Sequence, residues 1–366
     1  MALKCGIVGL PNVGKSTLFN CLSNAKAQSA NFPFCTIEPN IGVITVPDPR
    51  LTKLEELVKP QRTVPTTIEI VDIAGLVKGA SKGEGLGNKF LANIRETDAI
   101  IHVLRCFVDD NIVHVDGKVD PIRDKEVIDM ELQLKDLETV DGKVNSLARA
   151  VKSGDKELVK QFELSKRLKE ALEAGKSARV VKPSGDVEEK FYKELQLLTA
   201  KPVLYVCNVD EKSITSGNEL VEKVRQAIKD ESAEVLVVGA KIEADIAEFE
   251  SFEERKMFLD ELGLTESGVN RLIRSAYKLL KLQTYFTAGE KEVRAWTVRV
   301  GATAPEAAGV IHTDFEKGFI RAEVMKYGDF IELGSEQALK DVGKLHVEGK
   351  AYLVEDGDIM HFRFNV

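Results

Sequence analysis

The chain reads Gly9-Leu10-Pro11-Asn12-Val13-Gly14-Lys15-Ser16-Thr17 directly after a short apolar segment, Cys5 to Val8. The apolar segment predicts a buried strand, and residues 18–22, which follow, are apolar at helical spacing. Strand, glycine-rich turn and helix together form the context in which the spacing G-x-x-x-x-G-K-S binds phosphate. A chance glycine turn is the alternative, and the flanking strand and helix argue against it.

Each residue type in this stretch suits a bound nucleotide. Glycines at both ends let the backbone curl, so that successive N–H groups and the start of the helix point at phosphate oxygens. Lys15 is predicted to place its charge near the β- and γ-phosphates and to take part in catalysis, and the Ser16 hydroxyl to ligate Mg²⁺. We therefore expect nucleotide contacts from Asn12, Val13, Gly14, Lys15, Ser16 and Thr17.

Length and composition limit the remaining choices. A chain of 366 residues suggests about two to three domains. A net charge of −8 does not indicate nucleic-acid binding by the chain as a whole. The 5 cysteines are scattered without a C-x-x-C pair, which favours reduced thiols and no disulfide-linked partner. With no signal peptide and no apolar stretch of membrane-spanning length, we expect a cytoplasmic protein without membrane contact.

Two further segments predict the magnesium site. An apolar strand, Thr67 to Val71, delivers Asp72, whose carboxylate can hold Mg²⁺ through water, and Gly75 can offer its backbone N–H to the γ-phosphate. Thr36 lies in the loop between the first helix and the next strand, where GTPase-like proteins sense the γ-phosphate through the metal. The predicted metal ligands are therefore Ser16, Thr36 and Asp72.

The residue after Gly75 departs from the Ras-like pattern. Ras-like enzymes carry a glutamine there to orient the attacking water, and this chain has Leu76, which cannot form that hydrogen bond. Water must then be positioned from elsewhere, and we take His114 as the candidate. The glycine-dense run 79–87 is interpreted as a mobile switch, with a plain linker as the alternative.

Residues 121–200 show a different pattern. Apolar residues at alternating three- and four-residue steps predict an antiparallel helical hairpin. Residues 141–182 hold 11 Lys/Arg against 6 Asp/Glu, a net +5, in a chain of −8. The hairpin is therefore either a solvated face or a contact surface for RNA phosphates.

The segment after the next strand predicts the base specificity. It reads Asn208-Val209-Asp210-Glu211 where a GTPase has N-K-x-D. A longer carboxylate and the loss of the lysine should weaken guanine selection, because each unpaired buried polar group costs about 1–3 kcal/mol. The backbone around Val209 can meet the 6-amino edge of adenine instead. We therefore expect Asn208, Val209 and Glu211 at the base, and ATP ahead of GTP.

Residues 283–366 predict a strand-rich unit with one or two helices, which fits a small β-grasp fold. Its 10 Lys/Arg against 14 Asp/Glu do not indicate RNA binding. The expected domains are thus 1–120 with 201–282, 121–200, and 283–366. The fold class is α/β: a Ras-like P-loop NTPase with a doubly wound sheet, an inserted helical coiled-coil hairpin and a C-terminal β-grasp domain.

Together these motifs resemble the Obg-like ATPase (YchF) family of translation-factor-related P-loop proteins. The resemblance covers essentially the whole chain, and Leu76 with the N-x-x-E motif at Asn208 to Glu211 is its most specific part. It implies a slow ATPase associated with ribosomes and RNA, with a role in translation and stress response. It also implies that the C-terminal unit is a TGS domain.

The expected function is an Mg²⁺-dependent ATPase switch that binds the ribosome, at its large subunit, or RNA. Leu76 keeps open a second hypothesis, a nucleotide-gated binding protein with negligible turnover. A GTPase is the third, and Glu211 argues against it. Potassium is a further candidate cofactor, with Asn12 as its ligand.

Overall fold

In the computed structural model, which describes residues 3–24, 41–73, 86–114, 117–231, 233–249 and 251–365, the apolar segment before Gly9 forms a central strand. The sheet order is β2-β4-β1-β5-β6-β7. Its strands are β1 (Lys4–Val8), β2 (Ile41–Thr45), β4 (Thr67–Asp72), β5 (Ala99–Arg105), β6 (Val203–Asn208) and β7 (Glu234–Val238). From β4 to β7 all neighbours are parallel. The doubly wound P-loop sheet is thus confirmed.

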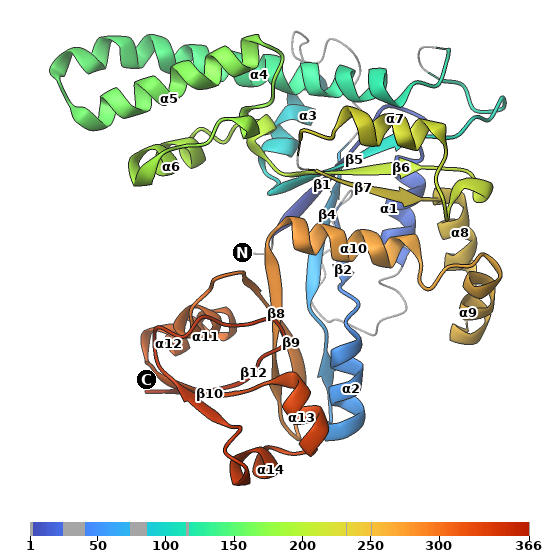
Figure 1. Cartoon of the computed structure of the whole chain (residues 1–366), viewed down its shortest axis with the longest axis vertical. Coiled ribbons are helices and arrows are strands. Elements are labelled where there is room, and N and C mark those ends of the chain that lie inside the picture. Colours follow the sequence, from blue (N-terminus) through green and yellow to red (C-terminus); the bar gives the residue numbers. More distant parts are fainter. Residues whose placement is uncertain are drawn as a thin grey trace. The chain divides into compact units, whose positions relative to one another are not determined.

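Helices follow these strands and cover the sheet, which explains why its central strands are almost uniformly apolar. All residues of β5 are buried. Helix α1 packs on α8, and α4 packs on α7 and β5 (Figure 1). The helices are α1 (Lys15–Asn24), α3 (Leu86–Arg95), α4 (Pro121–Ala150), α5 (Lys156–Glu173), α6 (Gly185–Glu194), α7 (Glu219–Ala227), α8 (Ala240–Glu248), α9 (Phe252–Glu261) and α10 (Gly268–Leu279).

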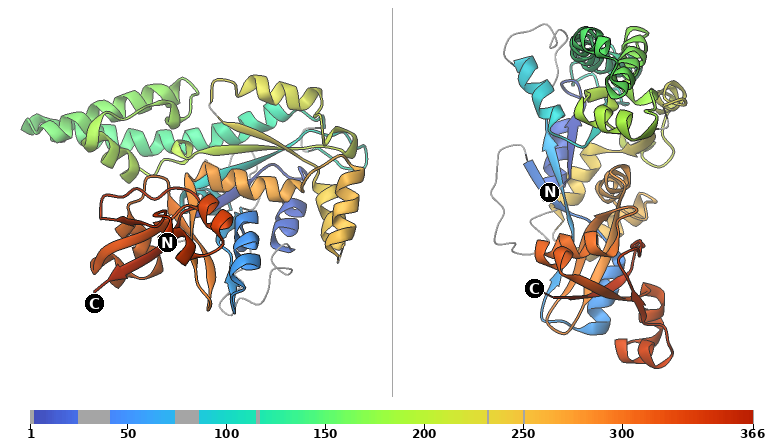
Figure 2. Two further views of the ribbon diagram at one scale, coloured as in Figure 1. Left: turned by 60° about the horizontal axis from the view of Figure 1, so that its bottom comes forward. Right: turned by 90° about the vertical axis from the view of Figure 1, so that its left-hand side faces the viewer.

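The predicted helical hairpin is confirmed. Asp120 caps α4 and Asp155 caps α5 through backbone N–H groups of their first turns, and Gly154 makes the turn between them with φ 78°. The two helices lie side by side and extend away from the sheet of their own unit (Figure 2). Their seam is formed by Val140, Leu147, Leu164, Leu168 and Leu172, with Leu137, Val144, Leu158 and Phe162 packed against them.

A second sheet has the order β11-β10-β12-β8-β9-β3. Its strands are β3 (Thr63–Val64), β8 (Leu282–Ala288), β9 (Val293–Arg299), β10 (Phe319–Met325), β11 (His346–Glu348) and β12 (Ile359–Phe364). The central pair, β8 and β12, is parallel, and each has an antiparallel neighbour, as expected for a β-grasp fold. The helices of this unit are α2 (Pro49–Val58), α11 (Ala304–Ile311), α12 (Thr313–Lys317), α13 (Tyr327–Leu333) and α14 (Glu336–Asp341).

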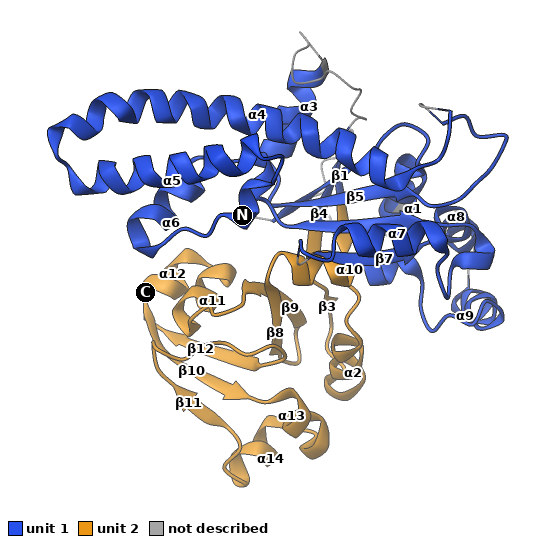
Figure 3. Ribbon diagram, turned by 45° about the horizontal axis from the view of Figure 1, so that its top comes forward, with its two compact units in different colours: residues 1–42, 69–272 blue, residues 43–68, 273–366 orange. Residues whose placement is uncertain are grey.

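The chain divides into two compact units, and the division differs from the predicted domain limits at one segment. Unit 1 contains residues 1–42 and 69–272, and unit 2 contains 43–68 and 273–366 (Figure 3). Leu51 and Leu54 of α2 belong to the core of unit 2, and β3 pairs with β9. Sequence reasoning assigned 43–68 to the nucleotide domain because nothing local shows where α2 buries its apolar face. The three-domain division itself stays a prediction.

Within the described residues, no helix has both the length and the apolar composition that crossing a bilayer needs. The cysteines Cys5, Cys21, Cys106 and Cys207 are free thiols and all buried, whereas Cys35 lies outside the described residues. Burial raises the pKa of Cys5 to about 12, so this thiol stays protonated at neutral pH.

Candidate nucleotide-binding site

The glycine-rich turn joins β1 to α1 in a space that admits no side chain at two positions. A Cβ at Gly9 would lie 2.8 Å from the carbonyl oxygen of Val103. Gly14 has φ +92°, and a Cβ there would overlap the side-chain amide of Asn208. Asn12 also has a positive φ, 63°. Left-handed residues in a tight turn aim consecutive N–H groups to one side, which is the geometry of an anion-binding concavity.

The polar residues at the start of α1 are placed as the phosphate-loop prediction requires. Ser16 and Thr17 are exposed in the first helical turn, while Val13 is buried and anchors the turn to the core. Lys15 is 9 % exposed and forms an ion pair with the carboxylate of Asp72 at the end of β4. The structure therefore brings together the lysine predicted to bind phosphate and the aspartate predicted to bind the metal, although they are far apart in sequence.

This donor set fits magnesium. Mg²⁺ prefers hard oxygen ligands and is usually held by one or two protein groups together with substrate phosphates. Asp72 supplies a carboxylate beside the lysine that precedes the exposed Ser16 hydroxyl. Thr36, the third predicted ligand, lies outside the described residues, as do Gly75 and Leu76.

Asn208 ties the phosphate loop to the next two loops along the sheet edge. Its side-chain N–H donates to the carbonyl oxygen of Val13 at 2.9 Å, and its Oδ1 accepts from the backbone N–H of Ala240 at 2.9 Å. The residue is 5 % exposed, so both bonds are shielded from water. Sequence reasoning predicted a base contact for Asn208; the structure adds a bracing role that joins β6, α1 and α8.

The other base-loop residues flank Asn208. The backbone N–H of Val209 donates to the carbonyl oxygen of Val238 at 2.9 Å, which leaves its own carbonyl as the acceptor that it can present to a base. Glu211 is exposed and begins a short 3₁₀ turn, Glu211–Ser213, that is capped by Asp210. Its carboxylate thus stands on a defined turn at the edge of the sheet.

A buried arginine, which sequence reasoning missed, shapes the loop after β5. The Arg105 guanidinium is 1 % exposed and donates to three carbonyl oxygens of this loop, those of Phe107, Asp109 and Ile112, at 3.0–3.3 Å. It also lies over the Phe107 ring, 4.7 Å from the centroid. An arginine as the last residue of a largely apolar strand is the signal that could have revealed this role. The loop is thereby wrapped around one side chain.

The wrapped loop places His114 beside the phosphate loop. The Asn12 side-chain amide donates to the carbonyl oxygen of Val113 at 3.1 Å, so the backbone next to His114 touches the glycine-rich turn. His114 itself is 6 % exposed, and its Nε2 lies 2.9 Å from Oδ2 of Asp124, in the first turn of α4. His114 thus lies in the loop after β5 and is buried against a carboxylate.

His102, a second histidine near this site, lies in the core. It is 2 % exposed in β5, and its ring lies 5.6 Å from that of Tyr205. Burial, reinforced by the nearby charge of Lys125, lowers the pKa of His102 from 6.5 to about 3. It is therefore neutral at physiological pH.

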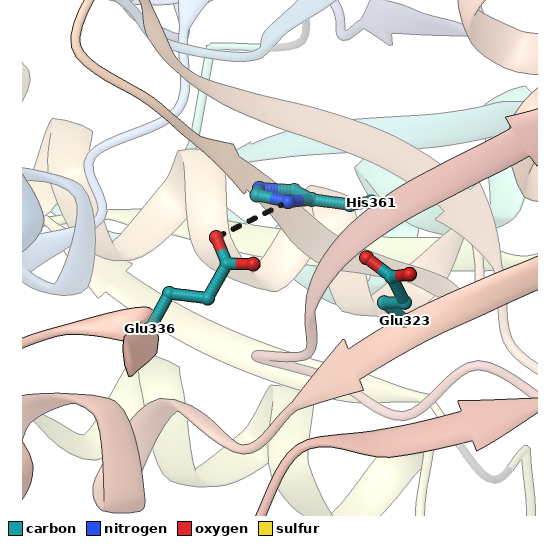
Figure 4. Close-up of side chains that lie close together, drawn as sticks. All are labelled: Glu323, Glu336 and His361. Carbon is teal, nitrogen blue, oxygen red and sulfur yellow. Dashed lines mark ion pairs between the residues drawn. The ribbon is translucent and has the colours of Figure 1, made fainter. Parts of the chain in front are cut away.

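A second group of metal-type side chains lies in unit 2. Carboxylate oxygens of Glu323 and Glu336 and a ring nitrogen of His361 lie within 4.8 Å of one another (Figure 4). Glu323, however, is already held by two hydrogen bonds from the Arg363 guanidinium, at 2.8 and 3.2 Å. This neutralises the carboxylate and holds its pKa below the usual value. We assign no metal to this cluster.

Comparison with known proteins agrees with this geometry. The chain is 58 % identical to the ribosome-binding ATPase YchF of Bacillus subtilis, with 100 % of both chains covered. The chain belongs to the YchF family. The YchF protein of Escherichia coli O157:H7, also named a ribosome-binding ATPase, is 57 % identical over 100 % of both chains. A YchF-type C-terminal domain, described as a protein of unknown function, matches residues 282–365, and a 50S ribosome-binding GTPase domain matches 4–141.

A solved structure gives the same family. The YchF GTPase of Schizosaccharomyces pombe superimposes with a TM-score of 0.89 at 38 % identity, covering 99 % of this chain and 97 % of that one. A GTP-binding protein of Pyrococcus horikoshii has a TM-score of 0.58 at 19 % identity and shares the fold. The YchF fold predicted from the sequence motifs is therefore confirmed over the whole chain.

Proposed function

We propose that this YchF protein is an Mg²⁺-dependent ATPase that acts at the ribosome in the cytoplasm. The observation that carries the proposal is the meeting of Lys15 and Asp72 beside the exposed Ser16 hydroxyl at the turn between β1 and α1. Relatives named ribosome-binding ATPases, identical at 57–58 % of positions over their full length, support the reaction and the partner.

Hydrolysis follows from charge and position. Bound Mg²⁺, held by Ser16, Asp72 and Thr36, would neutralise phosphate charge. Lys15 and the N–H groups of the turn stabilise the charge that develops on the γ-phosphate oxygens, and Gly75 adds a further N–H. A water oxygen bonds to the γ-phosphorus while the bond to the β–γ bridging oxygen breaks. ADP leaves with that electron pair, and the water proton passes to the phosphate product.

His114 is proposed to position the attacking water, the role that Leu76 cannot fill. The contact from Asn12 to Val113 supports this, because it fixes the loop that carries His114 to the phosphate loop. Because Leu76 replaces the water-orienting glutamine, the reaction should be slow until a partner assists.

ATP is proposed as the preferred nucleotide over GTP. Guanine presents two donors, N1–H and the 2-amino group, which the Asp of N-K-x-D accepts, whereas adenine presents an acceptor at N1. The Glu211 carboxylate lies one methylene farther from the backbone than the carboxylate of that aspartate, and Val209 stands where the motif has lysine. The Val209 carbonyl can accept from the adenine 6-amino group.

We place the RNA contact at the outer end of the helical hairpin. There, five basic side chains are exposed, and no ion pair is recorded for them among the described residues: Lys143, Arg149, Lys152, Lys156 and Lys160. Several basic residues farther from the tip are paired, as Lys169 is with Asp141 and Arg167 with Glu188. Unpaired lysines at an exposed tip are suited to RNA phosphates, and their binding should weaken with salt.

The activity is tested by phosphate release from ATP with and without ribosomes, with the Lys15→Ala variant as the inactive control. Turnover that rises with ribosomes supports the proposal. No turnover in either condition, with ATP still bound, would instead establish a nucleotide-gated binding protein.

The RNA surface is tested by reversing charge at the tip. Lys152→Glu with Lys156→Glu should weaken ribosome cosedimentation and flatten its salt dependence by about two units of slope. The matched control reverses two lysines that are paired in the structure, Lys166→Glu with Lys169→Glu. An equal effect of both pairs would refute a specific role for the tip.

A further inference from the structure

The carboxylate that faces His114 has no role in the functions described so far. Asp124 is 1 % exposed, and its Oδ2 lies 2.9 Å from Nε2 of His114. It stands in the first turn of α4, where Asp120 caps the helix through the backbone N–H groups of Ile122 and Arg123. The capping and the adjoining Pro121 fix the backbone of this turn. Asp124 is therefore held in place by structure outside the nucleotide site.

The contacting atoms decide which ring nitrogen of a neutral His114 carries the proton. An ionised carboxylate only accepts hydrogen bonds, so a neutral His114 must carry its proton on Nε2 in order to donate to Asp124. The other ring nitrogen, Nδ1, then bears the lone pair. A nitrogen with a lone pair can accept a hydrogen bond from water, whereas an N–H cannot.

We infer that Asp124 is a positioning residue, which holds His114 in the Nε2–H tautomer so that Nδ1 can accept a hydrogen bond from the attacking water. This inference rests on the proposed role of His114 in hydrolysis. The chain supplies the arrangement in two steps: Arg105 and Asn12 fix the loop, and Asp124 fixes the ring. A buried carboxylate that orients an imidazole in this manner works through the histidine without touching the substrate.

The substitution Asp124→Asn separates this role from simple packing. Oδ1 of Asp124 lies 3.7 Å from the Arg123 guanidinium, so an asparagine should keep its oxygen on that side and turn its NH₂ toward His114. The amide would then donate to Nε2, and the histidine proton would move to Nδ1. Shape and burial stay almost unchanged, while the acceptor at Nδ1 is lost.

Turnover and nucleotide affinity give the first readout, measured on the full chain with ribosomes. For Asp124→Asn we expect kcat to fall about 10- to 100-fold, the range of one misplaced acid–base group, with the affinity for ATP unchanged within about twofold. His114→Gln should lower kcat by at least as much, and adding Asp124→Asn to it should cause no further loss. If the double variant instead shows the product of the two single losses in kcat, the inference is overturned.

The second readout is spectroscopic and needs no activity. The chain has 5 histidines, so nitrogen-15 NMR of histidine-labelled protein can resolve them, and the His114 signals are those missing from His114→Gln. Wild-type protein should show a protonated Nε2, and Asp124→Asn a protonated Nδ1. A protonated Nδ1 in the wild type refutes the inference even if Asp124→Asn does not fold.

The two levels of the proposal fail differently. If His114→Gln hydrolyses ATP at the wild-type rate, the role of His114 in the proposed function is wrong, and that of Asp124 with it. If His114→Gln is slow but Asp124→Asn is as fast as wild type, only the positioning role is wrong.

Discussion

The side-chain amide of Asn208 donates to the carbonyl oxygen of Val13, and the same side chain accepts from the N–H of Ala240. One buried residue at the end of β6 thus hydrogen-bonds to a backbone group of the phosphate loop and to another at the start of α8. Because the Val13 peptide is part of the turn that holds phosphate, the shape of the turn depends on a residue almost 200 positions away in sequence.

Asn208→Ala should therefore destabilise the protein and weaken nucleotide binding. It leaves a buried carbonyl and a buried N–H without partners, at a cost of about 1–3 kcal/mol each. Thermal unfolding and ATP titration measure the two effects. The control is Asn145→Ala, an exposed asparagine on α4, which should change neither. Wild-type affinity in Asn208→Ala would contradict the bracing role.

Gly14→Ala should abolish ATP binding, because the new Cβ meets the Asn208 amide and the backbone has φ +92°. Gly154 provides a matched control: it has φ +78°, but nothing lies within 4 Å of its Cβ position. Gly154→Ala carries the backbone strain alone, about 1 kcal/mol, and should bind ATP normally. Equal affinity of the two variants in a fluorescent-ATP assay would exclude the proposed steric conflict.

The double substitution Val209→Lys with Glu211→Asp restores the N-K-x-D pattern. We expect the ratio of GTP to ATP affinity to rise by about 10-fold or more, since restored partners for the guanine donors are worth about 1–3 kcal/mol. Competition between the two nucleotides measures it. The control is Glu219→Asp, at the exposed start of α7, which should leave the ratio unchanged. An unchanged ratio in the double variant as well would show that residues 209 and 211 do not select the base.

Stability should fall in mild acid because of His102. Its pKa is lowered from 6.5 to about 3 in the folded protein, so between these values the unfolded chain binds the extra proton. The resulting stability is complete above pH 6.5 and is lost as pH falls toward 3. From pH 7.5 to 5 the loss is about 2 kcal/mol.

Urea unfolding of wild type and His102→Phe at both pH values tests this difference. His102→Phe should lose that part of the pH dependence, and His312→Ala, an exposed histidine of unit 2, should retain it. Identical pH profiles for wild type and His102→Phe would show that another group is responsible.

Much of the fold and of the phosphate site was predictable because the signals are local. The pattern around Gly14 and Lys15 and the strand ending in Asp72 each predicted their own structure, and periodicity predicted both helices of the hairpin. The Asp124–His114 contact was not predictable, because its two members lie in different elements that only the folded loop brings together. Arg105 was overlooked for a different reason: its partners are backbone carbonyls of the following loop, and carbonyls leave no mark in the sequence.

The contribution of α2 and β3 to the second sheet has a consequence for synthesis. Leu51 and Leu54 leave the ribosome early, but their core partners, which include Phe286 and Met325, follow much later. At about 10 residues per second, this segment waits roughly 25 seconds with its apolar face uncovered. During that interval the nascent chain needs protection from aggregation, because unit 2 cannot be completed until the whole of unit 1 has emerged.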